Sequence, residues 1–278
     1  MSITNKQVAA RYGVRDDADP TVEAVVAVGA DQAPGSVLDV VLGHATVRDY
    51  LPEPLDDEVV TTLVAAAQSA ASSSNMQLWS VVVVTDPARK ARLAALAGDQ
   101  KHVAAAPLVL VFVADLARAR AAAGDLPATD LLDTTVVAVV DIGIAAQNAV
   151  LVAESLGLGA CYIGAIRNDP QGVAAELGLP DGTFAVVGVT LGRPDPSRRS
   201  HVKPRLPQQA VVHHETYDMD AQSPAVAVYE SRVAGFYAAM GMAGGWTARL
   251  TDRLGSPQSL NGRENLREAL VERGLPSN

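Results

Sequence analysis

Two short segments concentrate side chains that could bind a phosphate group. His44, Thr46 and Arg48 alternate in HATVRDY, and Lys203 and Arg205 stand on either side of a proline in KPRLP. Alternation would place the first three on one side of an extended segment, although Thr46 could instead cap the next helix, the favoured interpretation for that segment alone. The proline keeps the two cations out of a regular helix, so both can converge on one multivalent anion. Together the segments predict a phosphate site.

Three further clusters could contact a planar ligand. Ser72, Ser73 and Ser74 end a predicted helix, where their hydroxyls could bond loose backbone groups or the polar edge of a ligand. Gln100 follows a helix stop and precedes a buried strand, a position where binding residues often lie. Gly164 in YIGAI would let the backbone approach a flat ligand closely. Each cluster also fits an ordinary loop, so none of them defines a site alone.

Signatures of metal, nucleophilic and phosphoryl-transfer sites are absent from the sequence. The five histidines show no zinc spacing, and no GxSxG elbow, P-loop or GxGxxG occurs. Cys161 lies in an apolar stretch without a nearby activating residue. Four polar residues interrupt a long apolar segment, and we interpret them as structural and interface residues: Asp141, Gln147, Asn148 and Glu154. We therefore expect no metal site.

The composition indicates an acidic globular protein. Its 278 residues include 31 acidic and 22 basic side chains, a formal net charge of −9 that opposes binding to nucleic acid or an anionic membrane surface. The single cysteine cannot form an internal disulfide, which favours a cytoplasmic location. The N-terminus lacks the features of a secretory signal. Polar residues interrupt the apolar segment 134–156, so it predicts a buried helix and not a membrane span.

Helical and strand patterns are mixed without strict alternation, which favours a compact α+β sandwich over a doubly wound sheet. Helices are predicted over 56–70, 87–98, 134–156 and 262–274, buried strands over 78–86, 107–115 and 183–194, and a short strand or turn over 159–166. Residues 1–35 are predicted to form a variable extension with one helix and a connector at 32–36. Residues 36–207 would be the core, and 208–278 a C-terminal extension.

Six segments in order resemble the flavin reductase and oxygen-insensitive nitroreductase family, in its NADPH-dependent branch. They are HATVRDY, AASSSNMQ, GDQKHVAAAP, the long apolar helix continuing into GACYIGAIRND, GVTLGRPD and KPRLP. The resemblance implies an FMN-binding α+β fold whose mostly antiparallel central sheet is flanked by helices. It also implies an intertwined homodimer with each flavin at the subunit interface, and a C-terminal extension, 208–278, that contacts the partner.

The resemblance also assigns roles to individual residues. His44, Thr46, Lys203 and Arg205 would hold the FMN phosphate and ribityl chain, and Arg48 would reach the phosphate or the N1/O2 end of the ring. The residues implied to border the ring are Ser72, Ser73 and Ser74 of the other subunit, Gln100, and Tyr162, Ile163, Gly164 and Ala165. No protein acid or base is required, because the chemistry belongs to the cofactor.

The implied activity is ping-pong hydride transfer from NADPH or NADH, through flavin N5, to a small-molecule acceptor such as a nitroaromatic, quinone or flavin. One region departs from the family, whose NADPH-dependent branch has a basic loop after the position of Tyr237. This chain reads AAMGMAGGW there, which predicts a weakened NADPH preference unless Arg249, or Arg198 and Arg199, substitute. Two alternatives stay open: a flavin reductase that supplies reduced FMN to a monooxygenase, and an FMN-binding protein without turnover.

Overall fold

The computed structural model describes residues 3–13, 20–29, 35–124, 126–220 and 222–275. Contacts within the chain form two compact units: unit 1 comprises residues 1–45 and 200–259, and unit 2 comprises residues 46–199 and 260–278. Each unit therefore combines segments that are far apart in sequence. The division into a core at 36–207 and two extensions follows chain order instead, and it stays a prediction.

A four-stranded sheet forms the centre of unit 2. The strands are β1 (Trp79–Val84), β2 (Leu108–Asp115), β3 (Gly159–Ile163) and β4 (Thr183–Gly192), in the order β1-β2-β4-β3, and every neighbouring pair is antiparallel. The central strands β2 and β4 are buried almost throughout. The prediction that β1 is buried is wrong: Val83 is 44% exposed, because an edge strand has a neighbour on one side only.

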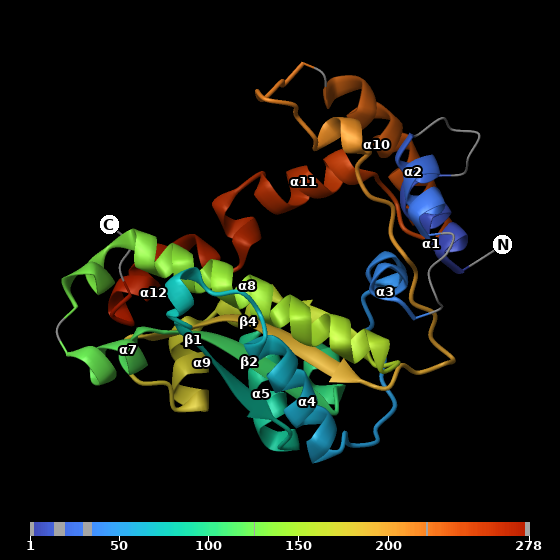
Figure 1. The fold of residues 1–278 in the computed structure, drawn as a ribbon. Coiled ribbons are helices and arrows are strands. Elements are labelled where there is room, and N and C mark those ends of the chain that lie inside the picture. The colour runs from blue at the N-terminus through green and yellow to red at the C-terminus, as the bar shows by residue number, and fades with distance from the viewer. Residues whose placement is uncertain (1–2, 14–19, 30–34, 125, 221, 276–278) are drawn as a thin grey trace. The chain divides into compact units, whose positions relative to one another are not determined.

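Helices cover both faces of this sheet (Figure 1). One face carries α4 (Asp57–Gln68) and α8 (Leu132–Ser155), and the other carries α5 (Pro87–Leu96), α6 (Lys101–Ala105) and α9 (Pro170–Leu177). Side chains of β2 alternate between the two cores, since Leu110 and Phe112 face α8 whereas Val109 and Val111 face the other layer. The predicted α+β sandwich with an antiparallel sheet is confirmed.

Acidic residues begin several helices of unit 2, as N-caps that typically contribute about 1 kcal/mol each. Asp86 accepts from the Arg89 N–H at 2.7 Å at the start of α5. Asp115 accepts from the Arg118 N–H at 2.9 Å at the start of α7 (Leu116–Ala123). Asp169 accepts from the Gly172 N–H at 2.8 Å at the start of α9. Single 3₁₀ turns occupy Ser73–Asn75, Pro127–Asp130, Gly164–Arg167, Gln208–Ala210, Pro257–Leu260 and Arg263–Asn265.

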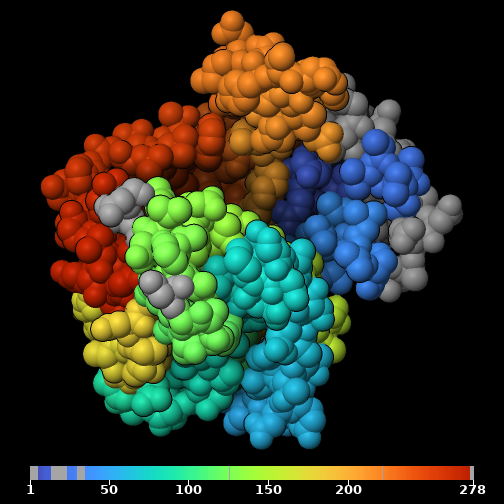
Figure 2. Space-filling model, turned by 60° about the vertical axis from the view of Figure 1, so that its left-hand side comes forward, coloured from blue at the N-terminus to red at the C-terminus, as the bar shows by residue number. Residues whose placement is uncertain are grey.

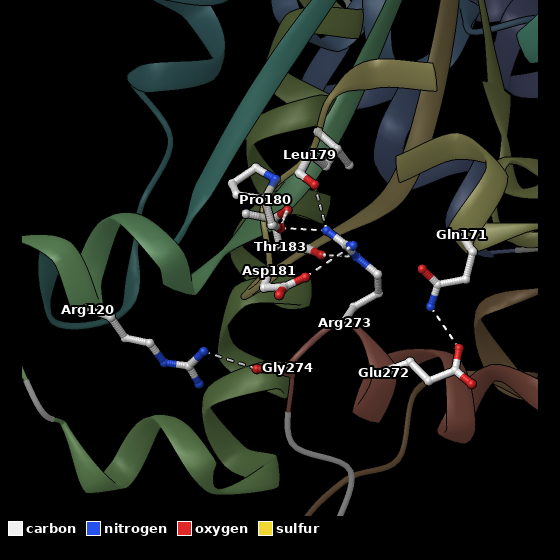
Figure 3. A network of polar contacts seen from close by, with 9 residues as sticks. All are labelled: Arg120, Gln171, Leu179, Pro180, Asp181, Thr183, Glu272, Arg273 and Gly274. Atoms are coloured by element: carbon white, nitrogen blue, oxygen red, sulfur yellow. Dashed lines mark hydrogen bonds and ion pairs between the residues drawn. The ribbon is translucent and has the colours of Figure 1, made fainter. Parts of the chain in front are cut away.

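The last segment of the chain, ending in α12 (Leu266–Glu272), packs on unit 2 itself. Figure 3 shows Arg273 donating to the loop before β4, at the carbonyls of Leu179 (2.8 Å) and Pro180 (2.5 Å), and to the first residue of β4, at the Thr183 carbonyl (3.3 Å). Arg120 donates to the Gly274 carbonyl at 3.1 Å beside it. These bonds fix the C-terminal helix to the chain's own sheet. Contact of residues 208–278 with a partner subunit stays a prediction.

Unit 1 contains α1 (Ile3–Tyr12), α2 (Pro20–Gly29), α3 (Val37–Gly43), α10 (Gln222–Ala239) and α11 (Trp246–Leu254). The sequence predicts one N-terminal helix and the structure has two. Most of the predicted connector at 32–36 lies outside the described residues. A small core joins α1 to α3 through Val8 and Leu42, both buried. The N-terminal segment is therefore packed against the start of the predicted core.

Candidate functional site

The three predicted phosphate-binding residues of unit 1 come together around Arg11 of α1. The Arg11 guanidinium donates to the His44 carbonyl at 2.8 Å and to the Lys203 carbonyl at 3.4 Å. The Arg205 N–H donates to the Arg11 carbonyl at 2.9 Å. Segments that are far apart in the sequence are thus neighbours within unit 1 through their backbone atoms. Anion binding by their side chains stays a prediction.

Pro204 lies between the two cations of the KPRLP segment. It is buried, whereas Lys203 and Arg205 on either side are exposed, and the turn is not helical. The Pro204 carbonyl accepts from the Tyr229 hydroxyl of α10 at 3.5 Å and from Arg205 Nη1 at 3.3 Å. The two cationic side chains are therefore presented at the surface from a turn that is braced on its inner side.

The segment from Thr46 to Tyr50 is extended and lies along β3 in unit 2. The Val47 N–H donates to the Ala160 carbonyl at 3.0 Å, and the Tyr50 hydroxyl donates to the Val47 carbonyl at 2.7 Å. A Cβ on Gly159 would lie 2.6 Å from Val47 Cβ, so the close approach depends on this glycine. The favoured interpretation of Thr46 as a helix cap is wrong, since α4 begins only at Asp57.

Arg48 lies close to the loop that begins α6. Burial is the main cause of a lowered pKa of His102, and the charge of Arg48 lowers that pKa further, partly opposed by Asp49. His102 Nε2 lies 3.9 Å from the buried Cys161 Sγ of β3. Because His102 is two residues beyond Gln100, unit 2 brings Arg48, the predicted Gln100 loop and β3 into one neighbourhood.

The serine loop is held by Asp141, a residue of α8 that is only 3% exposed. Ser72 Oγ donates to Asp141 Oδ2 at 2.5 Å, and the Ser73 N–H donates to Asp141 Oδ1 at 3.2 Å. Left-handed backbone conformations follow at Ser74 (φ 49°), Asn75 (φ 55°) and Gln77 (φ 51°). Such conformations cost on the order of 1–3 kcal/mol each and cluster at functional sites. The predicted structural role of Asp141 is confirmed, and it acts on a candidate binding loop.

The predicted ring-lining segment ends β3. Ile163 and Ala165 are buried, Gly164 is half-buried, and Tyr162 is 37% exposed. The Tyr162 hydroxyl donates to Gln147 Oε1 of α8 at 3.2 Å. Helix α8 therefore carries one residue that holds the serine loop and another that orients Tyr162.

Two arginines that the sequence does not single out lie beside Gly164. A Cβ at Gly164 would be 3.6 Å from Arg167 Nη2 and 3.7 Å from Arg263 Nη1. Arg11 is equally invisible in the sequence, because its partners are about 30 and 190 residues away, beyond the reach of helix or strand periodicity. The only available signal is an arginine at the end of a short predicted helix.

The phenols of Tyr50 and Tyr162 in unit 2 are hydrogen-bond donors. Burial raises the pKa of Tyr50 and of Tyr162 well above the usual range, so both phenols remain hydrogen-bond donors. Among the described residues, no three His, Cys, Asp or Glu side chains gather so as to hold a metal ion. What remains is a set of cations and hydrogen-bond donors in each unit.

Comparison with known proteins identifies the family that this arrangement resembles. The profile of the "Nitroreductase family" matches residues 41–193, and that of the "Nitroreductase family, C-terminal domain" matches residues 203–278. A Cr(VI) reductase of Pseudomonas sp. strain G-1 is 32% identical over 246 residues, which cover 86% of this chain and 98% of the relative. An FMN reductase [NAD(P)H] of Bacillus subtilis is 39% identical over 197 residues, covering 69% and 78%.

A solved structure supports the same grouping. The NADPH:FMN oxidoreductase from Vibrio harveyi, in complex with NAD⁺, superposes with a TM-score of 0.79 at 33% identity, covering 87% of this chain and 99% of the other. The fold and the sequence therefore point to the same set of relatives.

Proposed function

The chain belongs to the nitroreductase family, and on that premise we propose that it is an FMN-dependent NAD(P)H oxidoreductase acting on nitroaromatics, quinones or flavins. The observation that carries the proposal is the match over residues 41–193 and 203–278 to a family whose relatives are named FMN reductase and NADPH-flavin oxidoreductase. The donors in the two units fit the chemistry of this cofactor.

The residues of unit 1 suit the phosphate of FMN. Lys203 and Arg205 are exposed cations on one braced turn, and His44 lies on the neighbouring segment. Charge-assisted hydrogen bonds from such groups contribute about 1.5–3 kcal/mol each. We therefore assign the phosphate to these three residues, with Thr46 on the ribityl chain.

The residues of unit 2 suit the flavin ring. Gly164 has no side chain to block a flat ligand, and Tyr162, Ile163 and Ala165 flank it at the end of β3. We assign the polar edge of the ring to Gln100 and to Ser72, Ser73 and Ser74, the serines coming from the other subunit. Arg48, which lies near the Gln100 loop, is assigned to the N1/O2 end of the ring or to the phosphate.

Bound FMN would supply the two-electron chemistry, accepting hydride from NAD(P)H and passing it to the acceptor. The chain's residues would bind and orient the reactants. A cation such as Arg48 near N1/O2 would stabilise negative charge on the reduced ring, and no side chain has to remove or add a proton. The nucleotide could be NADPH or NADH, because the segment after Tyr237 has no basic residue before Arg249.

We propose that the protein is a homodimer, supported by an exposed apolar face on α8. The exposed residues of this face are Leu132 (43%), Val136 (49%), Val139 (42%), Val140 (53%) and Ile144 (40%). Figure 2 shows the green segment that includes α8 at the surface, beside the cyan atoms of α4 and the serine loop. An apolar face of this kind is typical of a protein interface. Its position beside the serine loop fits a site completed by the partner.

Helix α8 is also, by length and composition, the one described helix that could span a membrane. Its buried face packs on β2 and α4, as expected of a core helix, and a buried core helix passes the same test. We therefore propose a soluble cytoplasmic protein. Cys161 is buried and is the single cysteine of the sequence, which is compatible with a reducing compartment.

Spectroscopy and steady-state assays test the proposal and separate its alternatives. Purified protein should be yellow, or bind added FMN at micromolar concentration, and NAD(P)H should bleach the bound flavin under anaerobic conditions. A stable yellow protein that NAD(P)H does not bleach would indicate FMN binding without turnover. Faster turnover with free FMN than with nitrofurazone would favour a reductase that supplies a monooxygenase.

A further inference from the structure

We propose that Arg11, from the N-terminal helix α1, is a positioning residue that sets the geometry of the phosphate-binding residues His44, Lys203 and Arg205. The inference rests on the proposed FMN phosphate site of unit 1. Arg11 lies outside the matched family profile, which begins at residue 41. The N-terminal extension would thus be part of the cofactor-binding machinery.

Arg11 joins the two phosphate-binding segments through both its side chain and its main chain. Arg11 is 5% exposed. Its guanidinium donates to the carbonyls of Leu42 (2.8 Å), His44 (2.8 Å), Val41 (3.4 Å) and Lys203 (3.4 Å). The Arg11 carbonyl accepts from the Arg205 N–H at 2.9 Å. A planar guanidinium has five donors in fixed directions and can hold several carbonyls in one arrangement, whereas a lysine ammonium has only three donors, on a rotatable group.

The C-terminal end of α3 gives an electrostatic reason for the hydrogen bonds of Arg11. Helix α3 ends at Gly43, so its last carbonyls, including those of Val41 and Leu42, carry the partial negative charge of a helix C-terminus. That charge would disfavour a phosphate bound beside His44. The Arg11 guanidinium donates to these carbonyls and so offsets their partial negative charge, and it need not touch the phosphate.

The turn that carries Lys203 and Arg205 depends on α1 for its position. The segment is held on one side by Arg11 and on the other by Tyr229, whose hydroxyl lies 3.5 Å from the Pro204 carbonyl. Lys203 and Arg205 are exposed, and Arg205 Nη1 reaches only the carbonyls of its own turn among the bonds described, at 3.3 and 3.5 Å. Loss of Arg11 therefore leaves the spacing between the two cations and His44 poorly defined.

The test compares binding of FMN and riboflavin, which differ by the phosphate, to the full-length apoprotein by fluorescence titration. Arg11→Ala should lower FMN affinity roughly tenfold, equivalent to about 1.4 kcal/mol, and leave riboflavin affinity nearly unchanged. Arg11→Lys keeps the charge but not the planar set of donors, so it should lower FMN affinity by less than Arg11→Ala does. It also serves as the test if Arg11→Ala folds poorly.

A matched control is Arg273→Ala, because Arg273 is another buried arginine (9% exposed) that donates to backbone carbonyls, in unit 2. It should lower the melting temperature without changing the ratio of FMN to riboflavin affinity. An equal change of that ratio in both variants would reduce Arg11 to a general structural residue and overturn the inference.

Arg205→Ala separates this inference from the proposed function. If Arg205→Ala loses the preference for FMN over riboflavin while both Arg11 variants keep it, the positioning role is overturned and the phosphate site stands. If the unmodified protein shows no preference for FMN over riboflavin, the phosphate assignment itself fails, and the role of Arg11 fails with it.

Discussion

The two regions assigned to FMN are organised by opposite charges. In unit 1 a buried cation, Arg11, donates to backbone carbonyls of the phosphate segments. In unit 2 a buried anion, Asp141, accepts from the hydroxyl and backbone N–H of the serine loop. Arg11 and Asp141 therefore each provide hydrogen-bond partners for backbone or hydroxyl groups of a candidate binding segment.

The regions differ in the core that supports them. Asp141 belongs to α8, which is packed into the large core beneath the sheet, whereas Arg11 belongs to a short helix joined to α3 through the small cluster of Val8 and Leu42. The ring region should therefore be the more rigid one. The phosphate region should depend on a helix that can separate from the rest of unit 1 at low cost.

Replacement of Asp141 should produce the largest effect. Asp141→Ala removes the acceptor for Ser72 and Ser73 and should lower the free energy of unfolding by about 2 kcal/mol, measured by denaturant titration. FMN and riboflavin should lose affinity equally, in contrast to Arg11→Ala. A loss of affinity for FMN alone would contradict the assignment of Asp141 to the ring region. Asp141→Asn keeps the shape of the side chain and should lower the free energy of unfolding by less.

Replacement of Arg48 should change the reduction potential of bound FMN. Arg48→Gln removes a cation near the proposed N1/O2 end and should make the potential more negative, by roughly 30 mV for each 1.4 kcal/mol of lost stabilisation of the two-electron reduced state. Lys203→Gln in the phosphate region is the matched control and should lower affinity with little change in potential. Equal shifts in both variants would contradict the assignment of Arg48 to the ring.

Acid should weaken unit 2 through His102. Burial and then Arg48 lower the pKa of this imidazole, so the unfolded chain takes up the proton first as the pH falls below about 6.5. The neutral form's contribution to stability is present above that pH and is lost below it. His102→Gln should therefore reduce the loss of unfolding free energy between neutral and mildly acidic pH. An unchanged slope would show that His102 is not the responsible group.

The smallest expected effect concerns the nucleotide. Arg249 Cζ lies 3.9 Å from the centroid of the Tyr237 ring, so this guanidinium already has a partner within unit 1. We expect kcat/KM for NADPH and NADH to agree within roughly tenfold, about 1.4 kcal/mol. Steady-state kinetics with both nucleotides measure this directly, and a large advantage for NADPH would require another cation at the 2′-phosphate.

The sequence predicted the parts of the fold that local patterns determine. The unbroken apolar run of β2 and the length of α8 are visible in the sequence, and both are confirmed within about two residues. The cap assigned to Thr46 was wrong, because Val47 instead pairs with Ala160 of β3, a contact that no local pattern reveals. Burial of β1 was also overestimated, since its place at the sheet edge is a property of the topology.

Local motifs in the sequence predict some residues of the candidate site, whereas residues that act through tertiary contacts have no local signal. The proximity of His44 to Lys203 and Arg205 followed from two cationic segments that suit one anion. Arg11 could not be found in this way, because its role depends on carbonyls of Leu42 and Lys203 that come near it only after folding. Asp141 is visible in the sequence as a polar break in an apolar helix, but no local pattern indicates the loop that it holds.

The central claim is that this chain binds FMN and reduces it with NAD(P)H. The most direct test is anaerobic titration of the purified, FMN-loaded protein with NADPH or NADH, followed by its visible spectrum. The oxidised flavin band should disappear after about one equivalent of nucleotide per bound FMN, since hydride transfer carries two electrons. A protein that stays colourless in micromolar FMN, or whose bound flavin neither nucleotide reduces, would contradict it.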